Sequence, residues 1–449
     1  MENMENSVKP HENKMGTMPM TRLILTMSLP AIFSMTIQAM YNVVDSIFIG
    51  NYDADGLTAT SLAYPLQMLL IAFAVGTAVG VNSFVSRKLG EKNFVQANDG
   101  ATHGLVTCIF NYVIFLLLGL FAVRPFMAMY TQNEAILNYG IQYLTVVLCF
   151  SFFSIVQIMV EKTLQATGNM IAPMWFQIAG VVFNFVFDPL LIFGIGPFPK
   201  MGVVGAAVAT VLGYVVSTII ALIQLFLTKQ KVKPVFKNCL EPQMIKLIFS
   251  YGLPSFVMNA LGAFTVNFAN MFLVRYSDTA VAFFGAYFKV QQLIFMTVNG
   301  LIQGCLPIMR FNYRAKEYGR LKQANKSGTI IATVMMIVGM LLVLIFPKEI
   351  LFLFSASEEM CAFGVPAMRI MSLGFVFSGF SAMIATYEQA TDSIMPGVVV
   401  QLLRQGVLLV PVIWLLNSAV QMTGIWLAFP ITEFVTFLVA VVFAKIKNH

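Results

Sequence analysis

The chain has 449 residues, of which 58% are hydrophobic and only 10% are charged, and its formal net charge is +7 at pH 7. Soluble domains contain about 45–50% apolar and about 25% charged residues. This composition, with a mean hydropathy of +0.81, excludes a disordered chain, a secreted disulfide scaffold and an ordinary cytosolic enzyme. It favours an integral membrane protein with on the order of a dozen spans, because one span needs roughly 20 apolar residues.

Polar breaks divide the chain into twelve apolar runs, and each run predicts a transmembrane helix. In the first half the runs lie at 22–50, 57–86, 101–123, 134–160, 171–195 and 202–227. In the second half they lie at 245–275, 280–309, 327–346, 359–387, 396–416 and 423–444. An even number of spans puts both termini on the same side of the membrane.

Most lysine and arginine residues fall in one set of loops. They gather in the N-terminal tail, at the C-terminus and in the loops after even-numbered helices, where we place Arg87, Lys162 and Arg310. The opposite loops hold Arg124, Lys200, Arg275 and Lys348. The positive-inside rule therefore predicts that both termini are cytoplasmic.

The second half of the sequence repeats the first at a constant offset of 224 residues. The matching pairs are Leu29–Pro30 and Leu253–Pro254, Gly76 and Gly300, Gly80 and Gly304, Lys92 and Lys316, Glu134 and Glu358, and Gln165–Ala166–Thr167 and Gln389–Ala390–Thr391. One offset without a gap over so many pairs indicates a duplication.

The duplication predicts an all-α membrane protein of two pseudo-symmetric six-helix lobes, related by an axis along the membrane normal. We assign residues 1–20 to a cytosolic tail, 21–227 to an N-lobe, 228–243 to a basic cytosolic linker and 244–449 to a C-lobe. Transporters often have this design, with a central site between two lobes that rock. A channel built from tandem repeats is an alternative.

Ionisable groups within apolar spans are costly, so each one is a candidate functional residue. Asp45 lies in the first predicted helix, on the same face as Gln38 and Tyr41. Asp188 lies in the fifth predicted helix, four residues after Asn184 and on its face. The sixth helix carries Thr210 among small residues, which permit close helix packing.

Together, Asp45, Asn184, Asp188 and Thr210 predict one polar cluster in the N-lobe. Their oxygen atoms are hard ligands that could bind a sodium ion. The two carboxylates could equally hold a proton, because burial and mutual repulsion both disfavour two charges. A static hydrogen-bonding role between helices is the alternative for the acids, and packing is the alternative for Thr210.

The second half does not repeat this cluster, because Ala269 and Val412 stand at the positions equivalent to the two acids. It carries Lys289, which could face a cavity or extend to the membrane surface. It also carries Arg404 and Glu433 on neighbouring helices, and we expect these two to pair. Pro30 in the first helix removes a backbone hydrogen bond of that helix. It therefore predicts a bend that could act as a switch.

The chain resembles the MATE family of multidrug and toxic compound extrusion transporters. The resemblance rests on SLPAIFSMTIQAMYNVVDSIFIGNY in the first helix, SRKLGEKNF after the second and LQATGN before the fifth, and it covers nearly the whole chain. Within the family the chain is most similar to the bacterial MepA-like branch, near the DinF-like members.

The resemblance implies a cation-coupled antiporter that expels lipophilic cationic drugs by alternating access. It implies a coupling site for H⁺ or Na⁺ at Asp45, Asn184, Asp188 and Thr210, and no cofactor. Gln38, Tyr41 and Lys289 are expected to line or support the substrate cavity. NorM-like members also use acids on helices 7 and 10, whose interiors carry no acid here.

We expect a functional monomer in the cell inner membrane that binds small amphipathic cations and no nucleic acid. No Walker A, HExxH or GxSxG sequence occurs, so ATP-driven transport and common hydrolytic chemistry are not expected. The alternative function is a flippase for lipid-linked saccharides, from the wider superfamily. Such a protein would need a basic cavity, and the predicted spans contain few cations.

Overall fold

The computed structural model describes residues 14–131, 133–228, 230–235, 241–273, 275–352, 358–391 and 394–447. In this part of the chain all regular secondary structure is helical. The expectation of an all-α fold is therefore confirmed.

The first half contains α1 (Lys14–Thr17), α2 (Met20–Tyr52), α3 (Ala54–Gly90), α4 (Phe94–Leu117), the π-helix η1 (Leu118–Ala122), α5 (Val123–Ala128), α6 (Glu134–Cys149), α7 (Phe152–Ala166), α8 (Ile171–Phe193) and α9 (Val203–Leu227). The second half contains α10 (Pro242–Leu273), α11 (Asp278–Arg314), α12 (Tyr318–Ile345), α13 (Pro347–Phe352), α14 (Glu358–Ser372), α15 (Phe375–Ala390), α16 (Ile394–Leu402), the π-helix η2 (Leu403–Val407) and α17 (Leu409–Lys447).

Among the described residues, ten helices are long and apolar enough to cross a membrane, or eleven if the bent pair α6 and α7 forms one span. The α6–α7 pair bends by 48°. Helix α17 is broken at Val420 and Gln421, whose backbone angles are not helical. This break separates the two last predicted helices, so the twelve predicted runs each lie on a helix or on a broken helix.

The sequence repeat is also a repeat of helix ends. Helices α6 and α14 begin at the equivalent residues Glu134 and Glu358, and α7 and α15 end at Ala166 and Ala390. Helices α3 and α11 are each followed, two residues on, by a lysine with positive φ, at 58° for Lys92 and 60° for Lys316. The two halves therefore share not only helix ends but also the backbone conformation of equivalent single residues.

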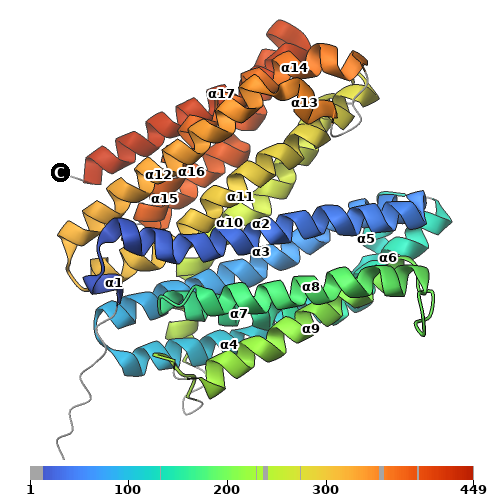
Figure 1. Cartoon of the computed structure of the whole chain (residues 1–449). Coiled ribbons are helices and arrows are strands. Elements are labelled where there is room, and N and C mark those ends of the chain that lie inside the picture. Colours follow the sequence, from blue (N-terminus) through green and yellow to red (C-terminus); the bar gives the residue numbers. More distant parts are fainter. Residues whose placement is uncertain are drawn as a thin grey trace, which may run out of the picture.

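The two halves lie side by side along their length (Figure 1). Helix α10 of the second half packs against α3, and α11 packs against α2. The start of α2 contributes Met20, Leu23, Ile24 and Met27 to the buried apolar cluster of the second half. Helices α2 and α3 thus form the first half's side of the boundary.

Glycines allow these boundary helices to approach closely. A Cβ atom on Gly80 of α3 would collide with the carbonyl oxygen of Ile248 on α10. A Cβ atom on Gly304 of α11 would lie 2.9 Å from the Cα atom of Ser28 on α2, and one on Gly300 would lie 2.7 Å from the Cα atom of Ile32. Small residues spaced four apart are a known means of close packing between transmembrane helices.

One end of the bundle is rich in cations, and we call it the basic end; it carries α1 and the ends of α3 and α11, at the left of Figure 1. There Glu91 pairs with Lys88 at 2.8 Å and with Arg314 of the second half at 3.6 Å. The linker 228–243 also returns at this end, but residues 229 and 236–240 lie outside the described residues. The division into an N-lobe, a linker and a C-lobe stays a prediction.

We predict that Gly304→Leu lowers the stability of the folded protein by about 1–3 kcal/mol, the usual cost of overpacking. The reason is that the new side chain would occupy the space of the α2 backbone. The measurement is the apparent thermal unfolding midpoint of the purified protein in detergent.

The matched control is Gly285→Leu on the same helix, where no atom lies within 4 Å of an added Cβ. It should leave the midpoint unchanged. An equal loss of stability in both variants would contradict a special role for the helix crossing.

Candidate functional site

Three helices of the first half bring the predicted polar cluster together. Asp45 lies in α2, Asn184 and Asp188 lie in α8, and Thr210 lies in α9. The Nδ2 atom of Asn184 donates a hydrogen bond of 3.3 Å to the Oγ1 atom of Thr210. The carboxyl groups of Asp45 and Asp188 are close enough to interact with each other. The structure therefore places all four residues in one neighbourhood.

Several oxygen atoms of this cluster are buried without a donor among the described residues. They are Asp45 Oδ1, Asn184 Oδ1 and both carboxyl oxygens of Asp188, whose side chain belongs to a residue only 1% exposed. Two facing carboxylates offer no donor unless one of them carries a proton. A buried, unpaired negative charge is costly, so this oxygen set suits a bound proton or a small hard cation.

Small residues hold α8 and α9 close enough to form the cluster. A Cβ atom on Gly213 of α9 would lie 2.8 Å from the carbonyl oxygen of Gly180 and 3.1 Å from the Cβ atom of Asn184. Within α8, Pro189 has no N–H group to donate, so it leaves a backbone carbonyl of the preceding turn free. This carbonyl is a further potential oxygen ligand next to Asp188.

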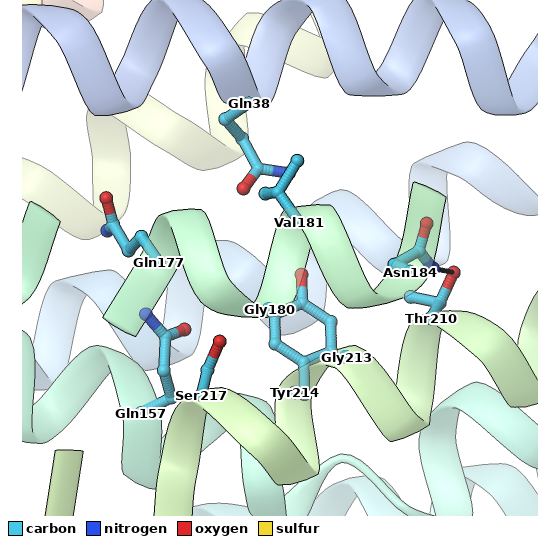
Figure 2. Close-up of a pocket in the computed structure, with 10 residues that line it drawn as sticks. All are labelled: Gln38, Gln157, Gln177, Gly180, Val181, Asn184, Thr210, Gly213, Tyr214 and Ser217. Atoms are coloured by element: carbon cyan, nitrogen blue, oxygen red, sulfur yellow. Dashed lines mark hydrogen bonds between the residues drawn. The ribbon is translucent and has the colours of Figure 1, made fainter. Parts of the chain in front are cut away.

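A polar pocket adjoins the cluster (Figure 2). It is lined by Gln38, Gln157, Gln177, Gly180, Val181, Asn184, Thr210, Gly213, Tyr214 and Ser217. Gln38 reaches into it from α2, and the hydrogen-bonded pair of Asn184 and Thr210 forms its other side (Figure 2). The pocket and the polar cluster therefore share Asn184 and Thr210, so a ligand in the pocket lies next to the cluster.

The remaining predicted residues lie elsewhere or are not described. The side chain of Tyr41 lies outside the described residues. Lys289 lies on α11 with an exposed side chain and does not line the pocket. Pro30 is half-buried within α2, which runs as one helix from Met20 to Tyr52. A cavity role for Lys289 and a bend at Pro30 stay predictions.

Three basic residues that we expected in loops are buried in helices instead. Arg87 lies in α3, Lys162 in α7 and Arg310 in α11, and all three are less than 9% exposed. The prediction of loops was wrong here because each cation finds acceptors inside the protein. Arg87 donates to the carbonyl oxygen of Gln389 at 3.1 Å, and Arg310 donates to Asn82 Oδ1 at 2.9 Å.

Lys162 belongs to a buried network that the sequence analysis missed. Its Nζ atom contacts Glu161 Oε1 at 2.8 Å, Gln165 Oε1 at 3.1 Å and Gln303 Oε1 at 2.6 Å. The Gln177 amide, which lines the pocket, donates to Glu161 Oε2. Adjacent opposite charges near the end of an apolar run were the available signal for this network.

The second half carries an ion pair between η2 and α17. Arg404 Nε and Glu433 Oε1 are 2.7 Å apart, which confirms the expected pairing. The Arg404 guanidinium also lies over the Phe295 ring, 5.1 Å from its centroid. By the 224-residue offset, Arg404 corresponds to Gly180, which lines the pocket of the first half.

Comparisons with known proteins agree with the duplicated architecture. The profile of the MatE family matches residues 30–190 and 254–415. The multidrug export protein MepA of Staphylococcus haemolyticus is 25% identical over 431 residues, which cover 95% of this chain and 94% of that protein. MepA of Staphylococcus aureus strain MSSA476 is 25% identical over 410 residues, which cover 91% of this chain and 89% of that protein.

Solved structures share the fold. One is described as an outward-facing multidrug resistance MATE family transporter of the MOP superfamily; it has a TM-score of 0.91 and 22% identity, and covers 100% of this chain and 98% of its own. Another, a MOP superfamily transporter from Pyrococcus furiosus described as having a binding pocket of reverse polarity, has a TM-score of 0.91 and 21% identity with the same coverage.

We predict that Arg404→Met lowers the free energy of unfolding by about 3–5 kcal/mol, because Glu433 then keeps an uncompensated charge in a largely buried place. The side chains of the pair are only 12% and 15% exposed. The double variant Arg404→Met/Glu433→Gln should recover most of the loss. The measurement is thermal or denaturant unfolding of the three proteins, and a double variant no more stable than Arg404→Met would contradict the pairing argument.

Proposed function

Because the chain belongs to the MatE family, we propose that it is a secondary active multidrug efflux transporter, which exports lipophilic cations in exchange for H⁺ or Na⁺. The multidrug export relatives support a transporter, and not an enzyme, over almost the whole chain. The observation that carries the coupling is the carboxyl pair of Asp45 and Asp188, in which Asp45 Oδ1 and both Asp188 oxygens are buried without a donor among the described residues.

The proposed cycle is alternating access. When the pocket is open to the cytosol, the ionised carboxylates of Asp45 and Asp188 favour the entry of a cation. After the pocket opens to the outside, a proton or sodium ion binds the two acids, and the exported cation loses affinity. Return to the inward state releases the coupling ion. Net exchange requires the two ligands to prefer different states of the protein.

The neighbouring residues support this cycle in different ways. Asn184 Oδ1 and the Thr210 hydroxyl would complete an oxygen site for Na⁺, whereas a proton needs only the carboxyl pair. Gln38 lines the pocket next to them and would contact the substrate; we propose cavity roles for Tyr41 and Lys289 as well. Pro30 would let α2 move when Asp45 changes its charge.

The protein is a multi-pass membrane protein, and we place it in the inner membrane with both termini in the cytoplasm. The concentration of cations at the basic end supports this orientation. We propose that the monomer is the transporting unit, because the pocket and the carboxyl pair are built within a single chain. Amphipathic cations are the proposed substrates, since the described pocket lining carries no Lys or Arg. That lining is unsuited to the pyrophosphate of a lipid-linked saccharide, which counts against a flippase.

We predict that Asp45→Asn abolishes efflux of a fluorescent lipophilic cation such as ethidium from cells that make the protein. The amide cannot take up a proton or neutralise a cation, so the exchange loses its coupling group. The measurement is dye retention at equal expression. The matched control is Glu134→Gln, which removes an exposed carboxylate at the start of α6 and should export normally. Unimpaired efflux by Asp45→Asn would overturn the coupling site.

We also predict that efflux stops when the gradient of the coupling ion is removed. A protonophore at a constant sodium gradient collapses the proton gradient, and a sodium ionophore at constant pH collapses the sodium gradient. The treatment that stops efflux identifies the ion. Efflux that continues after both treatments in cells with normal ATP would contradict secondary transport.

A further inference from the structure

The proposed cycle leaves one buried ion pair of the first half unused. Glu161 and Lys162 are consecutive residues of α7, and their side chains are only 7% and 8% exposed. Taking two charges out of water is costly, and such a pair rarely adds stability over apolar residues of similar size. Its position between the pocket and the boundary of the two halves points to a role in transport.

The carboxylate of Glu161 lies directly behind the wall of the pocket. The Gln177 amide lines the pocket and donates to Glu161 Oε2. Gln157, which also lines the pocket, precedes Glu161 by four residues on α7 and so lies on the same helix face. Rotation of a single amide side chain would therefore bring the Glu161 carboxylate into contact with a ligand in the pocket.

The ammonium group of Lys162 connects this carboxylate to the second half. Its Nζ atom donates to Gln303 Oε1 on α11 at 2.6 Å, and the Gln165 amide donates to the same oxygen at 3.2 Å. The Gln303 amide in turn lies 2.9 Å from the sulfur of Met35 on α2. The described contacts of the Gln303 amide are all with the first half, so they depend on the two halves being closed at this point.

We propose that Glu161 binds the positive charge of the transported cation, and that Lys162 is the protein's own cation, which occupies this place until the substrate displaces it. The inference rests on the proposed function, since it names the carboxylate that takes the charge of the exported compound. The pocket then lies between two acidic positions, with Asp45 and Asp188 for the coupling ion and Glu161 for the substrate.

Displacement of Lys162 has a consequence for the boundary of the halves. Once a substrate cation pairs with Glu161, the ammonium group loses its counter-ion in a dry environment and must move toward water. It then leaves Gln303, which removes one of the two described hydrogen bonds between α7 and α11 and leaves that of the Gln165 amide. Substrate binding thereby favours separation of the halves at this point.

The test is equilibrium binding of ethidium, a permanent cation, to the purified protein. We expect Glu161→Gln to raise the Kd at least fivefold, because the counter-charge is lost. We expect Lys162→Met to lower the Kd at least threefold, because the competing ammonium is lost. The double variant Glu161→Gln/Lys162→Met removes both charges and keeps the interior neutral, so it should bind ethidium more tightly than Glu161→Gln but more weakly than Lys162→Met. Binding of Nile red, an uncharged dye, should be equal in all of them.

The outcomes distinguish failure of the role of Glu161 from failure of the proposed function. Shifts of the ethidium Kd in the same direction for both single variants, or no shift in either, would overturn the role of Glu161 and leave a purely structural ion pair. Thermal unfolding of each variant identifies loss of folding, and the double variant provides a folded protein without Glu161 if a single variant fails. A wild-type protein that neither binds nor exports ethidium would overturn the proposed function and this inference with it.

Discussion

The close approach of the two halves depends on glycines. Gly80 meets the backbone of α10, and its counterpart Gly304 meets the backbone of α2, so the same repeated residue makes both crossings. At these distances any side chain would separate the helices. Polar contacts across the boundary, such as that between Lys162 and Gln303, are formed because the backbones lie this close. The crossings therefore determine where the two halves can form hydrogen bonds with each other.

Two copies of one architecture have acquired different interiors. The first half has Asp45 and Asp188 where the second has Ala269 and Val412. Conversely, the second half has Arg404 of its ion pair where the first has Gly180, which lines the pocket. The side chains inside the two halves differ, whereas the helix ends and the glycines at the helix crossings are equivalent. The predicted carboxyl cluster and the pocket thus both lie in the first half.

The helical runs and the carboxyl cluster could be predicted because they rest on strong signals, namely hydropathy and acids within apolar segments. Asp45 and Asp188 stand out in this way, and their neighbours share their helix faces. Gln157 and Gln177 could not be recognised, since neutral polar residues within spans are unremarkable until a pocket is seen. Lys162 was assigned to a loop because a cation near the end of an apolar run is usually solvated. Only the structure shows that Glu161 neutralises its charge and that Gln303 accepts a hydrogen bond from it inside the protein.

The equivalent lysines after α3 and α11 affect how the protein is held in the bilayer. Lys92 and Lys316 adopt the left-handed conformation, which for a residue with a side chain costs roughly 1 kcal/mol and which glycine would adopt freely. Both copies nevertheless carry a lysine, whose charge also complements the negative end of the helix before it. The two ammonium groups follow equivalent helix ends, and lipid phosphates would attract both of them. Each half would thus contribute one basic anchor to the membrane surface, held by a strained turn.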